Sequence, residues 1–203
     1  MHKLPKLELQ DTAKPLTMPA ALSPDLKRAI TYLSDKEKDK LLIRLIGKDP
    51  VLTEKLEYEL VENKTTLDQR RQLIRDFTDR TATLSQDSVG WMMMDMRTVS
   101  GYISRHIKVT KDAYGEVDLT IHMLNAFFDH HADLLQRLNS RTEKCAIYVA
   151  KRTDAILKKL NKLDPDYYME FEENMNKLLR YVYASAAANY ARQLDTPAEW
   201  YQR

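Results

Sequence analysis

The amino-acid sequence predicts an all-α protein: a helical bundle or a short α-solenoid-like array with two or three long antiparallel helices. Glycine is rare, with 4 among 203 residues, and the helix formers Leu, Lys, Glu, Arg, Ala and Met dominate. Residues 117–163 contain neither Gly nor Pro, and their apolar residues recur at steps of three and four, the spacing of one buried helix face. A Ser or Asp directly before Pro, which is typical of a helix start, occurs three times.

Residues 1–22 are expected to form a flexible N-terminal leader. Three prolines lie there among polar residues, and the leucines are too sparse to build a helix face. A docking peptide that uses Leu7 and Leu9 is the alternative. The remaining residues, 23–203, are expected to fold as a single all-α domain.

Short helices are expected in residues 23–85. Ser23 before Pro24 predicts one helix start, and Ser34 with Glu37 three residues later forms a capping box for the next. The same signals continue along this part of the chain, so the expected helices span residues 24–33, 35–46, 50–62 and 67–85.

Residues 41–60 contain two apolar helical stretches joined by Gly47 and the pair Asp49-Pro50. This pattern resembles the helix, Asp-Pro turn, helix unit of HEAT-like α-solenoids. The resemblance implies a protein-binding scaffold. The sequence contains no second copy at a fixed period, which an array of such repeats requires.

Long helices are expected in residues 88–195. They span residues 89–108, 117–163 and 165–194, with residues 109–116 as the longest internal loop. Asn139-Ser140 with Glu143 three residues after Ser140 is typical of a stop followed by a capping box. We therefore expect residues 117–163 to form two helices that meet near Asn139.

The densest polar cluster is the Asp-His-His-Ala-Asp sequence of residues 129–133. On a continuous helix Asp129 and Asp133 share a face, and His122 lies about two turns earlier on that side. Carboxylate and imidazole groups bind divalent metals, so His122, Asp129, His130 and Asp133 form a candidate metal site. The alternative is that these aspartates form a solvated face, since no two histidines are three or four residues apart.

A second acidic pattern consists of Glu59 and Glu62 followed by Asp76 and Asp79. It is similar to the carboxylate motif of all-α nucleotide pyrophosphatases, which implies Mg²⁺ held against substrate phosphates. The pattern departs from that family because Asp76 replaces a Glu. The expected helices also separate Glu62 from Asp76 by about 13 Å. Ordinary exposed charges are the alternative.

Charge disfavours nucleic acid as a partner. Lys and Arg number 32 against 30 Asp and Glu, so the whole chain is close to neutral. One local basic surface remains possible on the helix at 67–85, next to Arg105 and Lys108. Its residues are Arg70, Arg71, Arg75 and Arg80.

Other features predict a cytoplasmic protein without a cofactor. Cys145 is the single cysteine and cannot form an internal disulfide. The first residues lack a signal-peptide core, and no apolar run approaches the ~20 residues of a membrane span. Motifs for phosphate cradles, activated serines and paired cysteines are missing, so no cofactor is expected.

These patterns lead to a ranked set of function hypotheses. The first is a protein-interaction or scaffold module whose partner is another protein or a second copy of the chain. The second is a metal-dependent hydrolase of a nucleotide or phosphate ester that uses the 129–133 cluster. A nucleic-acid-associated helical protein ranks third.

Overall fold

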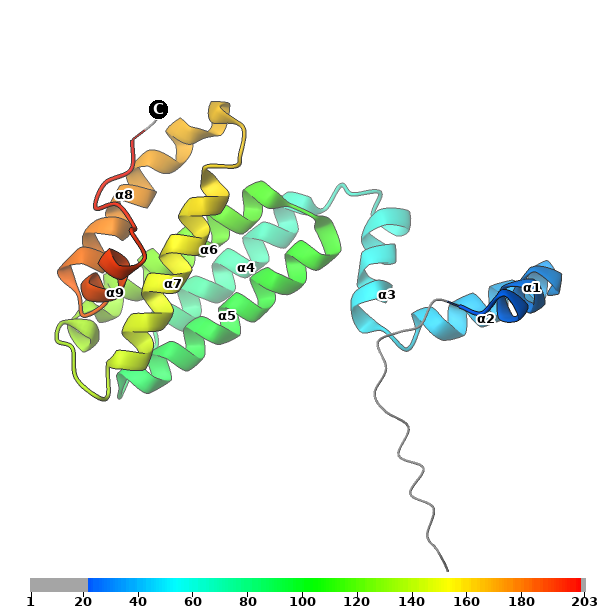
Figure 1. The fold of residues 1–203 in the computed structure, drawn as a ribbon, viewed down its shortest axis with the longest axis horizontal. Helices are drawn as coiled ribbons and strands as arrows, with labels where there is room; N and C mark the ends of the chain where they lie inside the picture. Colours follow the sequence, from blue (N-terminus) through cyan, green and yellow to red (C-terminus); the bar gives the residue numbers. More distant parts are fainter. Residues whose placement is uncertain (1–21, 202–203) are drawn as a thin grey trace, which may run out of the picture. The chain divides into compact units, whose positions relative to one another are not determined.

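The computed structural model describes residues 22–201, and every regular element in that range is a helix, which confirms the all-α class (Figure 1). Chain contacts divide the protein into two compact units, Met1–Lys48 and Asp49–Arg203. The expected single domain 23–203 stays a prediction, and the second of these units begins at Asp49. Nearly all of the predicted leader, with its Leu7 and Leu9 docking peptide, lies outside the described residues.

The described part of unit 1 contains two short helices, α1 (Pro24–Tyr32) and α2 (Asp35–Ile46). Both begin as predicted: the Ser23 hydroxyl accepts the Leu26 N–H at 3.2 Å, and Ser34 forms a capping box with Glu37. Neither helix contains a buried residue. The unit boundary falls inside the stretch 41–60, so the two halves of the predicted HEAT-like hairpin belong to different units.

Unit 2 contains the long helices. Its described elements, in chain order, are α3 (Pro50–Leu56), the π-helical turn η1 (Glu57–Val61), α4 (Leu67–Ala82), α5 (Val89–Thr110), α6 (Ala113–His131), the 3₁₀ turn η2 (Ala132–Leu135), α7 (Glu143–Leu160), the 3₁₀ turn η3 (Pro165–Tyr167), α8 (Tyr168–Ala184) and α9 (Ala188–Gln193).

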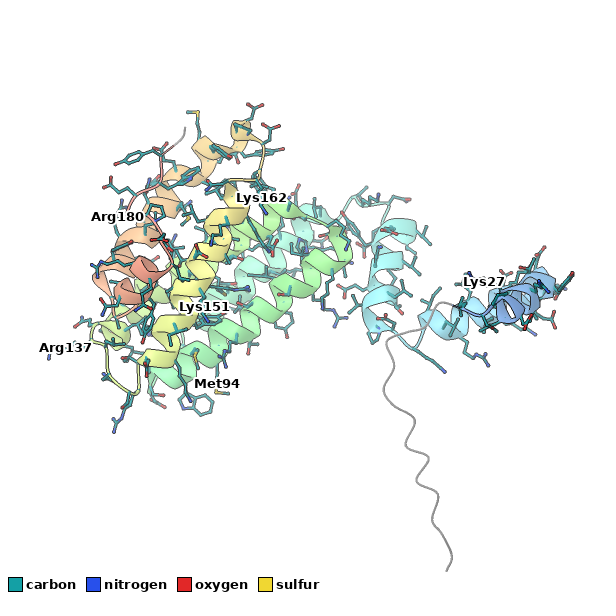
Figure 2. The ribbon with its side chains drawn as sticks, viewed as in Figure 1. Lys27, Met94, Arg137, Lys151, Lys162 and Arg180 are labelled. Carbon is teal, nitrogen blue, oxygen red and sulfur yellow. The ribbon has the colours of Figure 1, made fainter. Side chains whose placement is uncertain are left out.

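The α6 helix is the centre of unit 2. It contacts α4, α5, α7 and α8, which surround it in the bundle (Figure 1). A helix with one buried face shows a single apolar stripe, but the buried residues of α6 lie on most of its circumference. They are Gly115, Val117, Leu119, Thr120, Ile121, Met123, Leu124, Asn125, Phe127 and Phe128. Side chains on the outer surface, such as Met94 and Arg137, are exposed (Figure 2).

The predicted loop at 109–116 is wrong. The α5 helix continues to Thr110, and α6 begins at Ala113. Two residues make the connection: Lys111 has a left-handed backbone with φ of 62°, and the Asp112 side chain accepts the Gly115 N–H at 2.9 Å. A left-handed residue and a side-chain cap are enough to end one helix and start the next.

Residues 117–163 form two helices that meet near Asn139, as predicted, but the capping box is wrong. The Asn139 side chain accepts the N–H groups of Arg141 and Thr142, which turns the chain before α7. Glu143 is the first residue of α7, and its carboxylate accepts the Tyr190 hydroxyl.

The last predicted helix, 165–194, is interrupted. The α8 helix ends before Ser185, whose backbone is extended, and α9 follows from Ala188. The N–H of Ala186 donates to the carbonyl of Leu135 at 2.7 Å. The two backbones can approach this closely because the side chains of residues 184–188 are small. The Ala186 N–H thus donates to a carbonyl from a distant part of the chain instead of to one within a helix.

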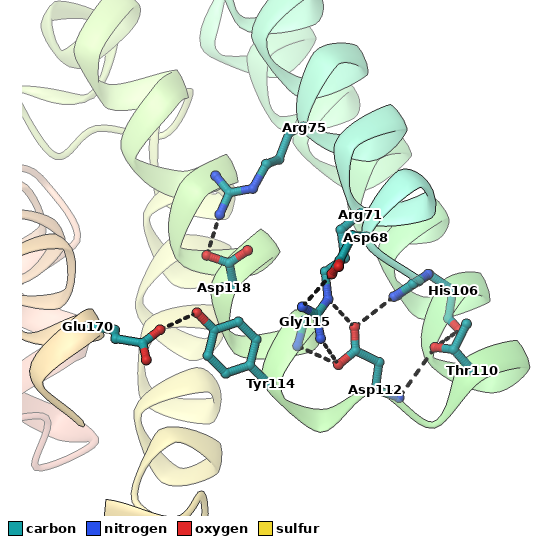
Figure 3. Close-up of polar contacts among 10 residues, drawn as sticks. All are labelled: Asp68, Arg71, Arg75, His106, Thr110, Asp112, Tyr114, Gly115, Asp118 and Glu170. Carbon is teal, nitrogen blue, oxygen red and sulfur yellow. Dashed lines mark hydrogen bonds and ion pairs between the residues drawn. The ribbon is translucent and has the colours of Figure 1, made fainter. Parts of the chain in front are cut away.

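A buried carboxylate joins the start of α4, the end of α5 and the start of α6 (Figure 3). The Asp112 side chain is 4% exposed, and Arg71 of α4 binds both of its oxygens, at 2.6 and 2.7 Å. His106 Nε2 of α5 lies 3.0 Å from Asp112 Oδ2. Burial raises the pKa of Asp112, but the hydrogen bonds from His106, Arg71 and the Gly115 N–H outweigh burial and lower this pKa well below its ordinary value.

We expect Gly115→Ala to lower the free energy of unfolding by about 2–3 kcal/mol. A Cβ atom at this position would overlap Asp112 Oδ2 and lie 2.9 Å from Arg71 Nε. Gly101→Ala is the control, because its Cβ meets nothing within 4 Å; as a helical Gly→Ala change it should stabilise by about 0.5–1 kcal/mol. Urea unfolding measures both, and an equal response of the two variants would contradict a packed Asp112 cluster.

Asp112 should also make stability depend on pH. Its folded pKa lies below the unfolded value of about 3.9, so its contribution is present above about pH 5 and is lost as the pH falls through the folded pKa. Asp112→Asn should cost about 3 kcal/mol at pH 7 and flatten the decline in unfolding free energy between pH 5 and 2.5. Asp68→Asn, which removes the 94% exposed partner of Arg71, should leave that decline unchanged. Parallel curves for all three proteins would exclude this role of Asp112.

Candidate functional site

A cavity of about 240 Å³ lies between α4, α6 and α8 in unit 2. The α6 helix lines it with Asp118, His122, Asn125 and Asp129, which follow one another at steps of four, three and four residues. This spacing places all four on one face of the helix. The most buried helix of the unit therefore presents one polar face, and that face borders the cavity.

Two ion pairs cross the cavity wall between helices. Arg75 of α4 pairs with Asp118 of α6 (Figure 3). Lys177 of α8 donates to Asp129 Oδ2 at 2.8 Å, and the Tyr181 hydroxyl donates to Asp129 Oδ1 at 2.6 Å. Each of these two cations in the lining is thus matched by a carboxylate.

Asp129 is held in its ionised form by these contacts. Burial raises the pKa of the Asp129 carboxyl, but the hydrogen bonds from Lys177 and Tyr181 outweigh burial, so that the pKa is lowered. The Tyr181 pKa is raised, chiefly because its hydroxyl donates to this carboxylate.

A third carboxylate has an imidazole as its partner. His122 Nε2 lies 2.7 Å from Asp79 Oδ1, which links α6 to α4. Both side chains border the cavity and retain access to solvent. Among the described residues, the ion pair of the Asp79 carboxylate is the one with His122.

Asn125 is the least accessible polar residue of the lining, with 6% exposure. Its Nδ2 donates to the carbonyl of Asn174 in α8 at 2.9 Å. Its Oδ1 atom is buried and accepts no hydrogen bond from residues 22–201. The Nδ2 group of Asn125 thus links α6 to α8, whereas its Oδ1 atom is an acceptor without a partner among residues 22–201.

The predicted metal ligands are only partly brought together. His122, Asp129 and His130 border the cavity, whereas α6 ends at His131 and leaves Asp133 exposed in η2. Asp129 and Asp133 therefore do not share a helix face. Across residues 22–201, no group of three or more His, Cys, Asp or Glu is arranged to hold a metal ion. The expected metal site thus finds no support in the geometry.

The acidic pairs of the pyrophosphatase-like pattern have separate partners. Glu62 Oε1 accepts Arg70 Nη2 at 2.7 Å. Asp76 accepts the Gln72 side chain, and Asp79 pairs with His122. Glu59 pairs with Lys55 at 3.8 Å, so each of the four acids has a different neighbour, and the structure does not support a shared Mg²⁺ ion.

The predicted basic surface is largely neutralised. Arg70 pairs with Glu54 and Glu62. Arg71 and Arg75 pair with aspartates of the α5–α6 connection and of α6, as described above. Arg80 donates from Nε to the carbonyl of Asp76. Three of the four arginines thus hold α4 to its surroundings, which weakens the case for a nucleic-acid surface.

Cys145 lies in the core with 1% exposure, and burial raises the pKa of its thiol to about 12. A thiol in this state is not a nucleophile near neutral pH. Cys145 is thus a core residue.

A second candidate site is the α2 apolar surface, which we define as Leu42, Ile43 and Leu45. These side chains are 57%, 70% and 52% exposed. At about 100° per residue, the apolar residues from Leu41 onward cover roughly half of the circumference of α2. Contiguous exposed apolar groups of this kind mark interaction sites in soluble proteins.

Sequence reasoning missed Asn125 and the cavity, although a signal was present. The 118–122–125–129 spacing places polar residues on one face of the most apolar helix, where each needs a partner. The partners on α4 and α8 come from distant parts of the chain, so the sequence alone does not bring them together.

Within residues 22–201, no helix combines the length and apolar composition needed to cross a bilayer. Comparison with known proteins finds no matching family model, no matching curated protein and no matching solved structure.

Proposed function

We propose that the protein is a protein-interaction module that docks its α2 apolar surface into an apolar groove of a partner protein. The observation behind this proposal is that α1 and α2 contain no buried residue while Leu42, Ile43 and Leu45 are each more than half exposed. Exposed apolar area of this kind favours association because a partner removes it from water.

The length of the two helices supports the same conclusion. The α1 helix has 9 residues and α2 has 12, whereas isolated helices shorter than about 12–15 residues are marginal in water. Their capping interactions favour the helical form locally, but helices in proteins gain most of their stability from packing an apolar face. A groove in a partner would supply that packing.

Charge specifies the chemistry of the partner. Residues 24–48 contain seven Lys or Arg and four Asp or Glu. The basic excess lies in the same segment of the chain as the α2 apolar surface, so we expect the complementary groove to have carboxylates along its rim. A basic amphipathic helix in an acidic, apolar groove is a recurrent mode of recognition.

The first step of the test is to identify the partner. A photo-crosslinking amino acid replaces Leu42 in the full chain, and mass spectrometry identifies the cross-linked proteins. Each captured protein is then purified and recombined with the chain, and calorimetry gives the dissociation constant and stoichiometry.

We expect Ile43→Asp to weaken binding to the purified partner at least tenfold, or about 1.4 kcal/mol, because it introduces a charge into the apolar contact. Leu73→Asp on α4 is the matched control, since Leu73 is 62% and Ile43 70% exposed, and it should change the affinity less than twofold. Binding should also weaken severalfold between 50 and 500 mM NaCl.

Three outcomes would overturn the proposal. Equal losses in Ile43→Asp and Leu73→Asp would show that α2 is not the contact. Insensitivity to salt would remove the acidic rim. A homodimer in light scattering that dissociates on Ile43→Asp would identify a second copy of the chain as the occupant.

A further inference from the structure

An open groove of about 410 Å³ lies between α5 and α7 in unit 2. Among residues 22–201, its lining contains four cationic side chains and no Asp or Glu. The cations are Arg97 of α5 and Lys144, Lys151 and Arg152 of α7. Because the whole chain has nearly equal numbers of acidic and basic residues, this groove is a local concentration of positive charge.

The Arg97 guanidinium is positioned by the floor of the groove. Its Cζ atom lies 5.6 Å from the centre of the Tyr148 ring, in a cation–π contact. The Tyr148 hydroxyl is hydrogen-bonded to Ser100 Oγ at 2.7 Å, and Ser100 is 8% exposed. Arg97 therefore rests on a ring that is anchored in the packed part of the unit.

The Arg152 side chain has a charge that the described chain does not fully satisfy. This side chain is half-buried, and its Nε atom is buried without a hydrogen-bond acceptor in residues 22–201. The Nε atom is closed to solvent, so a ligand does not contact it. A half-buried guanidinium with an unmatched donor nevertheless favours an anion beside its accessible part, which borders the groove.

The positive surface is short. Beyond the groove, Lys158 of α7 pairs with Asp154 at 2.7 Å, and Lys159 pairs with Glu116. The basic lining on α7 therefore spans residues 144–152, or about 12 Å at about 1.5 Å per residue. An extended polyanion such as a nucleic acid needs a longer track of cations. A short polyanion fits this groove better.

We propose that the groove binds a small ligand with a diphosphate or triphosphate group. The arginine guanidinium groups match phosphate oxygens in pairs, and the lysine ammonium groups add point charges. A single phosphate, with a charge of about −2, leaves half of the four cations unmatched, whereas linked phosphates balance them. The volume lies within the roughly 300–1,000 Å³ of ligand pockets. This binding does not depend on the α2 apolar surface.

The test is a nuclear magnetic resonance titration of the ¹⁵N-labelled full chain with sodium tripolyphosphate, in metal-free buffer with 50 mM NaCl. We expect saturable shifts of the α5 and α7 amides that border the groove, with a dissociation constant below about 1 mM. Sodium sulfate and sodium citrate are anions of other chemistry and should bind at least tenfold more weakly. Binding of tripolyphosphate should weaken at least fivefold at 300 mM NaCl.

Adenosine triphosphate identifies the source of the phosphate group. Tighter binding than that of tripolyphosphate indicates a nucleotide, and equal or weaker saturable binding indicates a free oligophosphate. Either result supports the proposal.

Variants assign the effect to the groove. Lys151→Gln and Arg97→Gln should each weaken binding at least threefold. Lys162→Gln and Arg180→Gln remove the same charges from exposed positions outside the groove and should leave the dissociation constant within twofold (Figure 2). Circular dichroism checks folding, and if Arg97→Gln fails to fold, the comparison of Lys151→Gln with Lys162→Gln decides the test.

The proposal is overturned if no saturable shift appears up to 5 mM tripolyphosphate, or if citrate or sulfate binds as tightly. Equal weakening in Lys151→Gln and Lys162→Gln would also overturn it, because that result indicates attraction by net charge rather than a site. A 12-nucleotide oligothymidylate that binds more tightly than tripolyphosphate and loses affinity in Lys151→Gln would identify a nucleic acid as the ligand instead.

Discussion

The burial of α6 is the constraint on which the rest of unit 2 depends. Four helices surround it, so its polar side chains need partners from those helices rather than from bulk water. Asp112, just before its start, is matched by Arg71 and His106, and Asp129, near its end, by Lys177 and Tyr181. Between them Asn125 is matched through one of its two polar atoms. The polar groups at both ends of the central helix are thus bonded to residues of α4, α5 and α8.

The parts of the fold that the sequence predicts correctly depend on local contacts. The caps at Ser23, Ser34 and Asp49 join atoms two or three residues apart, so a short stretch of sequence contains the whole interaction. The periodicity of residues 117–163 is local in the same sense, and it identified the central helix.

The wrong predictions involve contacts between distant residues. The helix break at Ser185 accompanies a backbone bond from Ala186 to Leu135, which no periodicity in residues 165–194 reveals. Residues 109–116 contain turn-forming types, but burial of Asp112 against Arg71 turns them into a tight helix junction. For the candidate site, the sequence supplied the polar face of α6, while the partners that neutralise it come from α4 and α8. Residue type alone therefore does not reveal that Arg70, Arg71 and Arg75 are paired with carboxylates.

The cavity and the α2 apolar surface differ in how far their geometry is fixed before binding. The cavity walls belong to helices whose positions are fixed by the core and by ion pairs, so the shape of the cavity is set before binding. Such preorganisation lowers the entropic cost of binding. The α1 and α2 helices bury none of their residues, so docking must also order their side chains and stabilise marginal helices. The cavity therefore has a fixed geometry, whereas the proposed docking of the α2 apolar surface depends on apolar area and charge, which a partner can match in several arrangements.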